Sequence, residues 1–385
     1  MELMTASRQH VTRPADERFT SLHALAAFTS YQKRHSARRT MPNRALTVVP
    51  SATDPLDIAC CGPNGHPAQF TNWSFQQLCS LAGVPAGYIT RSAMPGALAA
   101  DNINWGLHHH RPVESVSVHL FQDRDAPAGP ITFLRSVNGP DFGMVWDADI
   151  TTTLVQEFGD GVTGDWTVPG IFGHRLDAVT EANTTLYASD RDMWVFLADE
   201  SRRIDIPARR NNAPGSLARG FYLRNSGVGA GALTLGMFLF DYVCCNRIIW
   251  GAQQHQELRI RHTSGAPHRW LEEVKPILQQ YANSSPMGVQ ETIAAARQAK
   301  IRGDVADFLA TRFGKGLAGQ IQAIHQLEES RPIETTWDAV VGATAYARQL
   351  VHVDSRVAVE RQAGELLSLG RRALPLAIAG ADLGL

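Results

Sequence analysis

The spacing of hydrophobic positions changes along the chain near residue 232. Before it, short segments alternate apolar and polar residues, as half-buried strands do; the clearest are 115–122 and 131–137, joined by a turn with Pro and Gly. After it, apolar residues recur at spacings of three and four, which predicts successive helices up to residue 369. This order indicates an α+β protein, with an antiparallel-rich β-sheet core in the N-terminal two-thirds and a helical C-terminal third.

The same patterns divide the chain of 385 residues into three parts. A polar, Arg-rich stretch contains one short helical pattern at 23–31 and is otherwise expected to be a mobile basic arm. A mixed core follows, in which Thr71 or Asn72 can cap a helix over 71–84. The expected boundaries are 1–45 for the arm, 46–251 for the mixed core and 252–385 for the helical region.

The stretch FYLRNSGVGAGALTLGMFLFDYVCCNRIIWG, residues 221–251, is the most unusual part of the sequence. Its glycines match the pattern GxGxx[GA] of dinucleotide-binding proteins, but the nearest following acid, Asp241, comes too early for that site. We therefore expect a strand, a turn around Gly229 and a buried helix from residue 232, with Asn225 or Ser226 as the helix cap. The free N–H groups of such a helix could also hold a phosphate oxygen.

A basic segment precedes this turn. The net charge of −1 gives the whole chain no attraction to nucleic acid, but six arginines lie between residues 202 and 224 with loop composition around 206–220. One interpretation is a track for a nucleic-acid backbone, with Trp194, Phe221 and Tyr222 stacking on bases. The other is a solvated loop whose arginines pair with nearby acids: Asp190, Asp192, Asp199 and Glu200.

Other chemistry is not indicated. His108, His109 and His110 are adjacent, and no zinc-type spacing accompanies them, so no metal site and no cofactor are expected. Catalytic motifs are missing and no acid pair stands out, which favours a protein without catalysis but leaves an enzyme open. No signal peptide is recognisable, the apolar run at 232–245 is short for a membrane span, and five cysteines lack disulfide or zinc spacing; we expect a cytoplasmic protein.

Three segments resemble the family called domain of unknown function 932. The first is residues 220–251, where Asn225, Ser226, Gly229, Cys244 and Asn246 fit the family pattern and Arg247 stands where Gly is common. The others are RHTSG at 261–265 and TTWDAVVGATAYARQL at 335–350. The resemblance covers most of residues 60–370. It implies a protein of phages, plasmids or other mobile elements, in a context of replication, recombination or evasion of host defence.

These observations lead to one functional prediction and one alternative. The prediction is a mobile-element protein that binds single-stranded DNA or another nucleic acid, in strand annealing or replication, as a homo-oligomer. The alternative is an interaction module that docks on a host protein. The predicted nucleic-acid-binding residues are Arg202, Arg203, Arg209, Arg210, Arg219, Tyr222, Arg224, Asn225, Ser226 and Gly229.

Overall fold

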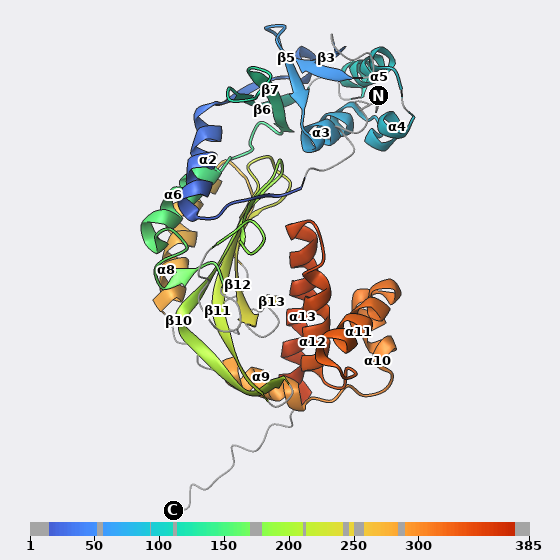
Figure 1. The fold of residues 1–385 in the computed structure, drawn as a ribbon. Helices are drawn as coiled ribbons and strands as arrows, with labels where there is room; N and C mark the ends of the chain where they lie inside the picture. The colour runs from blue at the N-terminus through green and yellow to red at the C-terminus, as the bar shows by residue number, and fades with distance from the viewer. Residues whose placement is uncertain are drawn as a thin grey trace, which may run out of the picture.

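A computed structural model describes most of the chain as two β-sheets with helices around them (Figure 1). The described residues are 15–51, 57–92, 94–110, 114–169, 179–210, 213–241, 246–249, 258–283 and 289–373.

The first sheet has six strands and lies in the upper part of Figure 1. Helices α3, α4 and α5 cover one of its faces, and their apolar side chains share a core with those of the strands. Helix α3 forms as the sequence predicts: Thr71 and Ser74 make a reciprocal capping box, and Gly83 ends the helix with a φ of 67°. In order across the sheet the strands are β2 (Ser36–Pro42), β6 (Ser115–Asp123), β7 (Ile131–Asn138), β5 (Pro67–Phe70), β4 (Ile58–Cys61) and β3 (Thr47–Pro50); the helices are α3 (Asn72–Ala82), α4 (Ala86–Arg91) and α5 (Gly96–His109).

The second sheet has eight strands, and its pairings are antiparallel. Two long strands, β10 and β11, form a hairpin through its middle, with a bulge between Ala198 and Arg203. The path runs β1 (Glu17–Arg18), β9 (Leu186–Ala188), β10 (Met193–Arg210), β11 (Ala213–Asn225), β12 (Leu233–Asp241) and β13 (Asn246–Ile249), with β8 (Trp166–Thr167) on β10 and β14 (Leu258–Ile260) on β12.

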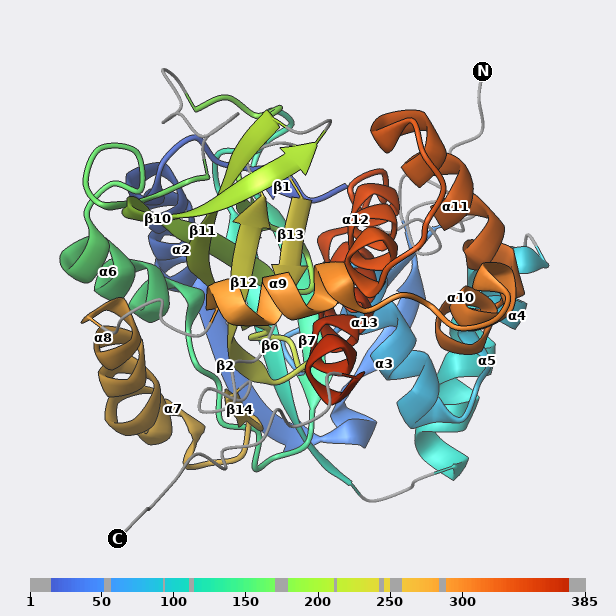
Figure 2. The same ribbon diagram turned by 90° about the horizontal axis from the view of Figure 1, so that it is seen from below.

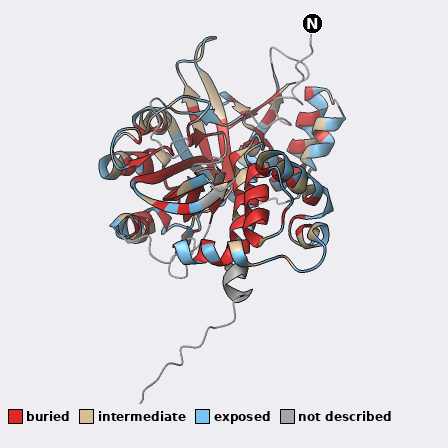
Figure 3. Ribbon diagram, turned by 60° about the horizontal axis from the view of Figure 1, so that its bottom comes forward, coloured by how far each residue is buried: buried red, intermediate tan, exposed pale blue. Residues whose placement is uncertain are grey.

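Helices cover both faces of this second sheet (Figure 2). On one face, Val195, Leu197 and Phe221 pack with α2, α6 and the α7–α8 region. On the other face, Ile204, Leu217 and Leu239 pack against the C-terminal helices. Figure 3 shows that the strands in the middle of the molecule are largely buried. The bounds are α2 (Leu22–Arg34), α6 (Asp147–Phe158), α7 (Ala266–Arg269), the π-helical turn η2 (Trp270–Val274), α8 (Lys275–Asn283), α9 (Val289–Gln298), α10 (Val305–Phe313), α11 (Lys315–Glu329), α12 (Thr336–Ala347) and α13 (Val353–Ala373).

The α+β prediction is confirmed: strands dominate the middle of the chain and helices its C-terminal third. The expected strand pair 115–122 and 131–137 is the antiparallel pair β6–β7. The C-terminal region also supplies a strand, β14, to the second sheet.

The predicted helix from residue 232 is wrong, because residues 233–241 form the strand β12. All nine of its residues are buried, since β11 pairs on one edge, β13 and β14 on the other, and helices cover the faces. A strand buried on both faces is apolar throughout and loses the alternation that identifies a strand. The Gly-rich turn, residues 226–231, therefore joins two strands and caps no helix.

The mobile arm is also corrected in its described part. Residues 15–45 form β1, α2, β2 and the short 3₁₀ helix η1 (Asn43–Ala45). Helix α2 contains the predicted 23–31 pattern and begins with Ser21 as its cap, which accepts from the Ala24 N–H at 3.1 Å. Strand β2 is an edge strand of the six-stranded sheet, so most of its side chains stay exposed and its sequence reads as polar.

Candidate functional site

The predicted basic loop is a β-hairpin, and most of its described arginines pair with carboxylates of the protein. Nε and Nη2 of Arg219 donate to Asp199 Oδ2 at 3.3 and 3.2 Å, in a pair whose side chains are only 3% and 2% exposed. Arg224 donates through the same two atoms to Asp192 Oδ2, at 3.1 and 2.9 Å. The interpretation in which the arginines pair with nearby acids accounts for these residues.

Two further hairpin arginines also have carboxylate partners. Arg203 meets Glu200 at 2.8 Å, and Arg210 donates through Nε and Nη2 to Oε1 of Glu329 on α11. Arg202 is exposed, whereas the side chain of Arg209 lies outside the described residues. The hairpin therefore does not present the six arginines together as an open basic surface.

The aromatic residues expected to stack on bases lie inside the protein. Trp194, Phe221 and Tyr222 are 2%, 0% and 0% exposed. Tyr222 packs against both Phe196 and Trp194, with ring centroids at 5.5 and 5.9 Å. These rings offer no face to a base in this structure, so the stacking role is corrected.

The Gly-rich turn is occupied by internal contacts. Asn225 is 0% exposed, and its Nδ2 donates to the Val145 carbonyl and to Asp147 Oδ1 at 2.8 and 2.7 Å. Ser226 Oγ accepts from the Ala230 N–H and donates to a carbonyl of the preceding hairpin turn. Gly229 has a φ of 85°, and a Cβ there would lie 2.7 Å from Asn138 Oδ1. The turn thus joins β11 to β12 within the second sheet and contacts Asn138 of β7 in the first, and no helix begins there to hold a phosphate.

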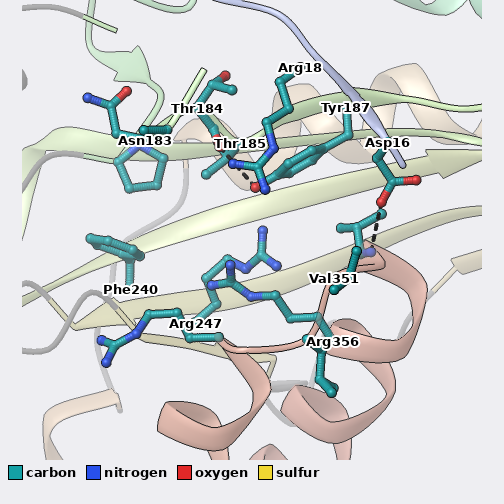
Figure 4. A pocket seen from close by; sticks show the side chains of 15 residues that line it. Asp16, Arg18, Asn183, Thr184, Thr185, Tyr187, Phe240, Arg247, Val351 and Arg356 are labelled. Carbon is teal, nitrogen blue, oxygen red and sulfur yellow. Dashed lines mark hydrogen bonds between the residues drawn. The ribbon is translucent and has the colours of Figure 1, made fainter. Parts of the chain in front are cut away.

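A different set of arginines surrounds a cavity of about 300 Å³, here called the arginine pocket (Figure 4). Arg18 enters from β1 on one side, while Arg247 of β13 and Arg356 of α13 approach from the other. Arg348, at the end of α12, also lines it. The remaining lining residues are Asp16, Pro169, Ala182, Asn183, Thr184, Thr185, Tyr187, Phe240, Leu350, Val351 and Val353.

Arg247 is the most constrained of the four. Its side chain is 0% exposed, Nε donates to Glu360 Oε1 at 3.0 Å, and the guanidinium lies 3.8 Å from the centre of the Phe196 ring. Nη1 and Nη2 find no hydrogen-bond partner among the described residues. Burial lowers the pKa of Arg247, and the neighbouring Arg356 lowers it further.

The arginines of the pocket share and spread their hydrogen bonds among several acceptors. Arg356 Nε also donates to Glu360 Oε1, at 2.7 Å, so one carboxylate serves two guanidinium groups. Arg348 pairs with Glu328, while Arg18 donates to the Glu181 carbonyl at 2.9 Å and lies over the Tyr187 ring. Asp16 accepts the Val353 N–H at the start of α13 (dashed in Figure 4). Of the residues that line the pocket, four carry a guanidinium group and one, Asp16, carries a carboxylate, so the lining itself has a positive excess.

A second, larger cavity of about 750 Å³ lies on the other side of residues 15–18. Ala15 and Glu17 line it, whereas Asp16 and Arg18 line the arginine pocket. This alternation follows from the period of two in an extended chain. We call it the aromatic cavity, because five rings line it: Phe28, Tyr31, Phe70, Phe121 and Phe133.

With this geometry in view, one comparison is informative. Residues 174–352 match the family model "Domain of unknown function (DUF932)". The match confirms the resemblance seen in the sequence and contains β9 to β14, α7 to α12, and the pocket residues Arg247 and Arg348. Arg18 and Arg356 lie outside it. No curated protein and no solved structure matches the chain.

No group of three or more His, Cys, Asp or Glu side chains is arranged to hold a metal ion in the parts of the chain that the structure describes. Among the same residues, no helix has the length and apolar character to cross a membrane. The sequence did not point to the arginine pocket: Arg247 stood out only as a departure from the family pattern, and nothing linked it to residues 18, 348 and 356.

Proposed function

We propose that this protein binds single-stranded nucleic acid, with one backbone phosphate in the arginine pocket. The observation that carries the proposal is Arg247, which lines a pocket with three other arginines and whose two terminal nitrogens are buried and lack a hydrogen-bond partner among the described residues.

A phosphate group suits this arrangement for two reasons. Its oxygens accept hydrogen bonds from the planar fork of a guanidinium, often two at once. A buried donor without a partner costs about 1–3 kcal/mol, which an incoming oxygen recovers. The positive excess of the pocket adds a long-range attraction for an anion.

The recessed position of these groups favours a single strand over a duplex. A single strand is flexible, so it can turn one phosphate into a recess, while duplex phosphates keep the fixed spacing of the helix. Because only one phosphate enters the recess, the binding constant should depend only weakly on salt concentration. One neutralised phosphate contributes a slope of about −0.7 in log K against log salt concentration.

The experiment is fluorescence anisotropy of a labelled single-stranded oligonucleotide with the wild-type protein and Arg18→Ala. Arg18 is exposed at the rim, so its removal leaves the core intact. Losing a charge-assisted hydrogen bond should weaken binding about tenfold to a hundredfold and reduce the salt slope by up to about 0.7. Arg39→Ala is the matched control, since Arg39 is exposed on β2 and lines neither cavity; it should change affinity less than about twofold.

No binding of the oligonucleotide at low salt would reject the nucleic-acid function. Equal losses with Arg18→Ala and Arg39→Ala would reject the arginine pocket as its site. The alternative from the sequence, docking on an acidic host protein, becomes the leading one if a purified partner binds in an Arg18-dependent way and the oligonucleotide does not.

The remaining parts of the proposal concern context. We further propose that the protein acts in the cytoplasm of a cell that carries a mobile element. There it would work as a homo-oligomer in annealing or replication. Free, buried Cys60, Cys61 and Cys79 support a reducing compartment. Light scattering of the purified protein with and without the oligonucleotide tests the oligomer; a monomer in both samples would reject it.

A further inference from the structure

The aromatic cavity contains a charged side chain, Arg135, that takes no part in the proposed phosphate site. Arg135 of β7 is 8% exposed and lines this cavity, and its Nε has no hydrogen-bond partner among the described residues. Burial lowers the pKa of Arg135, against the opposing effect of the carboxylates of Asp147, Asp190 and Glu17. A buried guanidinium that lines a cavity of about 750 Å³, and whose Nε–H has no partner among the described residues, indicates a ligand with an acceptor edge.

The walls specify more of that ligand. Rings from α2, β5, β6 and β7 line the cavity, and Phe121 and Phe133 lie within 15° of parallel. Aromatic walls favour a flat, unsaturated ligand that can stack. Phe28, Tyr31 and Phe133 are each only partly buried, so part of their ring surface remains available.

The charges exclude phosphate from this cavity. Four carboxylates line it, against the single guanidinium of Arg135: Glu17, Asp123, Asp125 and Asp190. A phosphate would meet this negative excess, whereas N–H and NH₂ groups would find acceptors. The lining therefore fits a ligand with no anionic group inside the cavity, with acceptors on one edge for Arg135 and donors on another for the carboxylates.

We propose that the aromatic cavity binds a guanine base, with its acceptor edge on Arg135 and any phosphate left outside. Guanine combines the required features: a stacking face, the O6 and N7 acceptors that arginine recognises in the major groove of DNA, and N–H donors on the opposite edge. The base can come from a free nucleoside or from a single strand of nucleic acid. The inference stands on this cavity alone and does not require the phosphate site.

The test is isothermal titration calorimetry of the full-length protein with guanosine. We expect guanosine to bind about tenfold or more tightly than cytidine, because the larger ring system stacks better and matches Arg135. GTP should bind more weakly than guanosine, since its phosphates approach the carboxylates of the rim. Tighter binding of GTP, or of an organic cation such as choline, would overturn the proposal.

A cavity-filling variant locates the site without touching the core. Ala27 is an exposed residue of α2 that lines the cavity, so Ala27→Trp places a large ring in it. Guanosine affinity should fall about tenfold or more, the value of one stacked base. Ala24→Trp is the matched control: Ala24 is exposed on the same helix and does not line the cavity, so binding should change less than about twofold. Equal affinity in both variants would reject the site.

Two further measurements separate the ligand sources and the two sites. If a guanine-containing oligonucleotide displaces guanosine from the wild-type protein but has no such effect on Ala27→Trp, the ligand is a base of a strand. If the oligonucleotide does not displace guanosine, the ligand is the free nucleoside. Arg18→Ala should leave guanosine binding unchanged. If Arg18→Ala lowers guanosine affinity as much as Ala27→Trp, the two cavities are not independent and the proposal fails.

Discussion

Gly236 offers a test in which the sign of the effect depends on the fold. It lies in β12 opposite Tyr222 of β11, and a Cβ built on Gly236 would come within 2.3 Å of Tyr222 Cε1 and 2.6 Å of its hydroxyl oxygen. The Tyr222 ring has no space to move away. It is 0% exposed, packs against both Trp194 and Phe196, and accepts a hydrogen bond from Arg361 at 3.1 Å.

Gly236→Ala should therefore destabilise the protein. Overpacking of a well-packed core costs about 1–3 kcal/mol, and the added clash is with a rigid ring. Replacing Gly by Ala in a strand recovers about 0.5–1 kcal/mol of backbone entropy. We expect a net loss of about 1–2 kcal/mol in the free energy of unfolding. A helix over residues 233–241 would give the opposite sign, a gain of about 1 kcal/mol.

The assay is equilibrium urea unfolding followed by far-ultraviolet circular dichroism. Gly319→Ala is the matched control, because Gly319 lies in α11 with nothing within 4 Å of an added Cβ; it should stabilise by about 0.8–1 kcal/mol. Combining Gly236→Ala with Tyr222→Leu removes the ring and should cost less than the sum of the single changes. Gly236→Ala at wild-type stability or above would refute the contact between these strands.

Two further predictions concern buried charges. Asp199→Asn removes the carboxylate that accepts from Arg219, in a pair 3.2 Å apart and nearly unexposed, and should lower the free energy of unfolding by about 3–5 kcal/mol in the same urea assay; a loss below about 1 kcal/mol would contradict it. Burial raises the pKa of Asp147 from 3.8 to about 6, so the folded state retains this proton longer than the unfolded state, and stability falls as pH rises between these values. Asp147→Asn should remove that fall, gaining about 1–3 kcal/mol relative to wild type across this pH range; parallel pH profiles would contradict it.

The sequence predicted correctly those helices and strands that are determined by residues close together in the chain. The alternation at 115–122 and the cap at Thr71 depend on neighbouring residues, and both appear as expected in β6 and α3. Residues 233–241 carried an ambiguous signal, since an apolar run of this length suits a buried helix or a strand covered on both faces. Only the pairing with β11, β13 and β14 decides between them.

The candidate site could not be predicted in the same way. Its four arginines come from β1, β13, α12 and α13, and no periodicity of the sequence relates residue 18 to residue 356. The polar composition of 206–220 suggested a loop, but that composition reflects ion pairs formed across and beyond a hairpin. Which acid meets which arginine depends on the register and on the bulge after Ala198.

The contrast between the hairpin and the pocket shows why the density of arginines along the sequence misleads. In the hairpin, Arg203, Arg219 and Arg224 each have a carboxylate of the same strand pair or its adjoining turn. In the pocket, Glu360 accepts from both Arg247 and Arg356. An anion is therefore bound most favourably where arginines share a carboxylate partner in the folded protein, even if they lie far apart in the sequence. The ratio of guanidinium groups to carboxylates around a cavity, and not their spacing along the chain, places the anion site at the arginine pocket in our proposal.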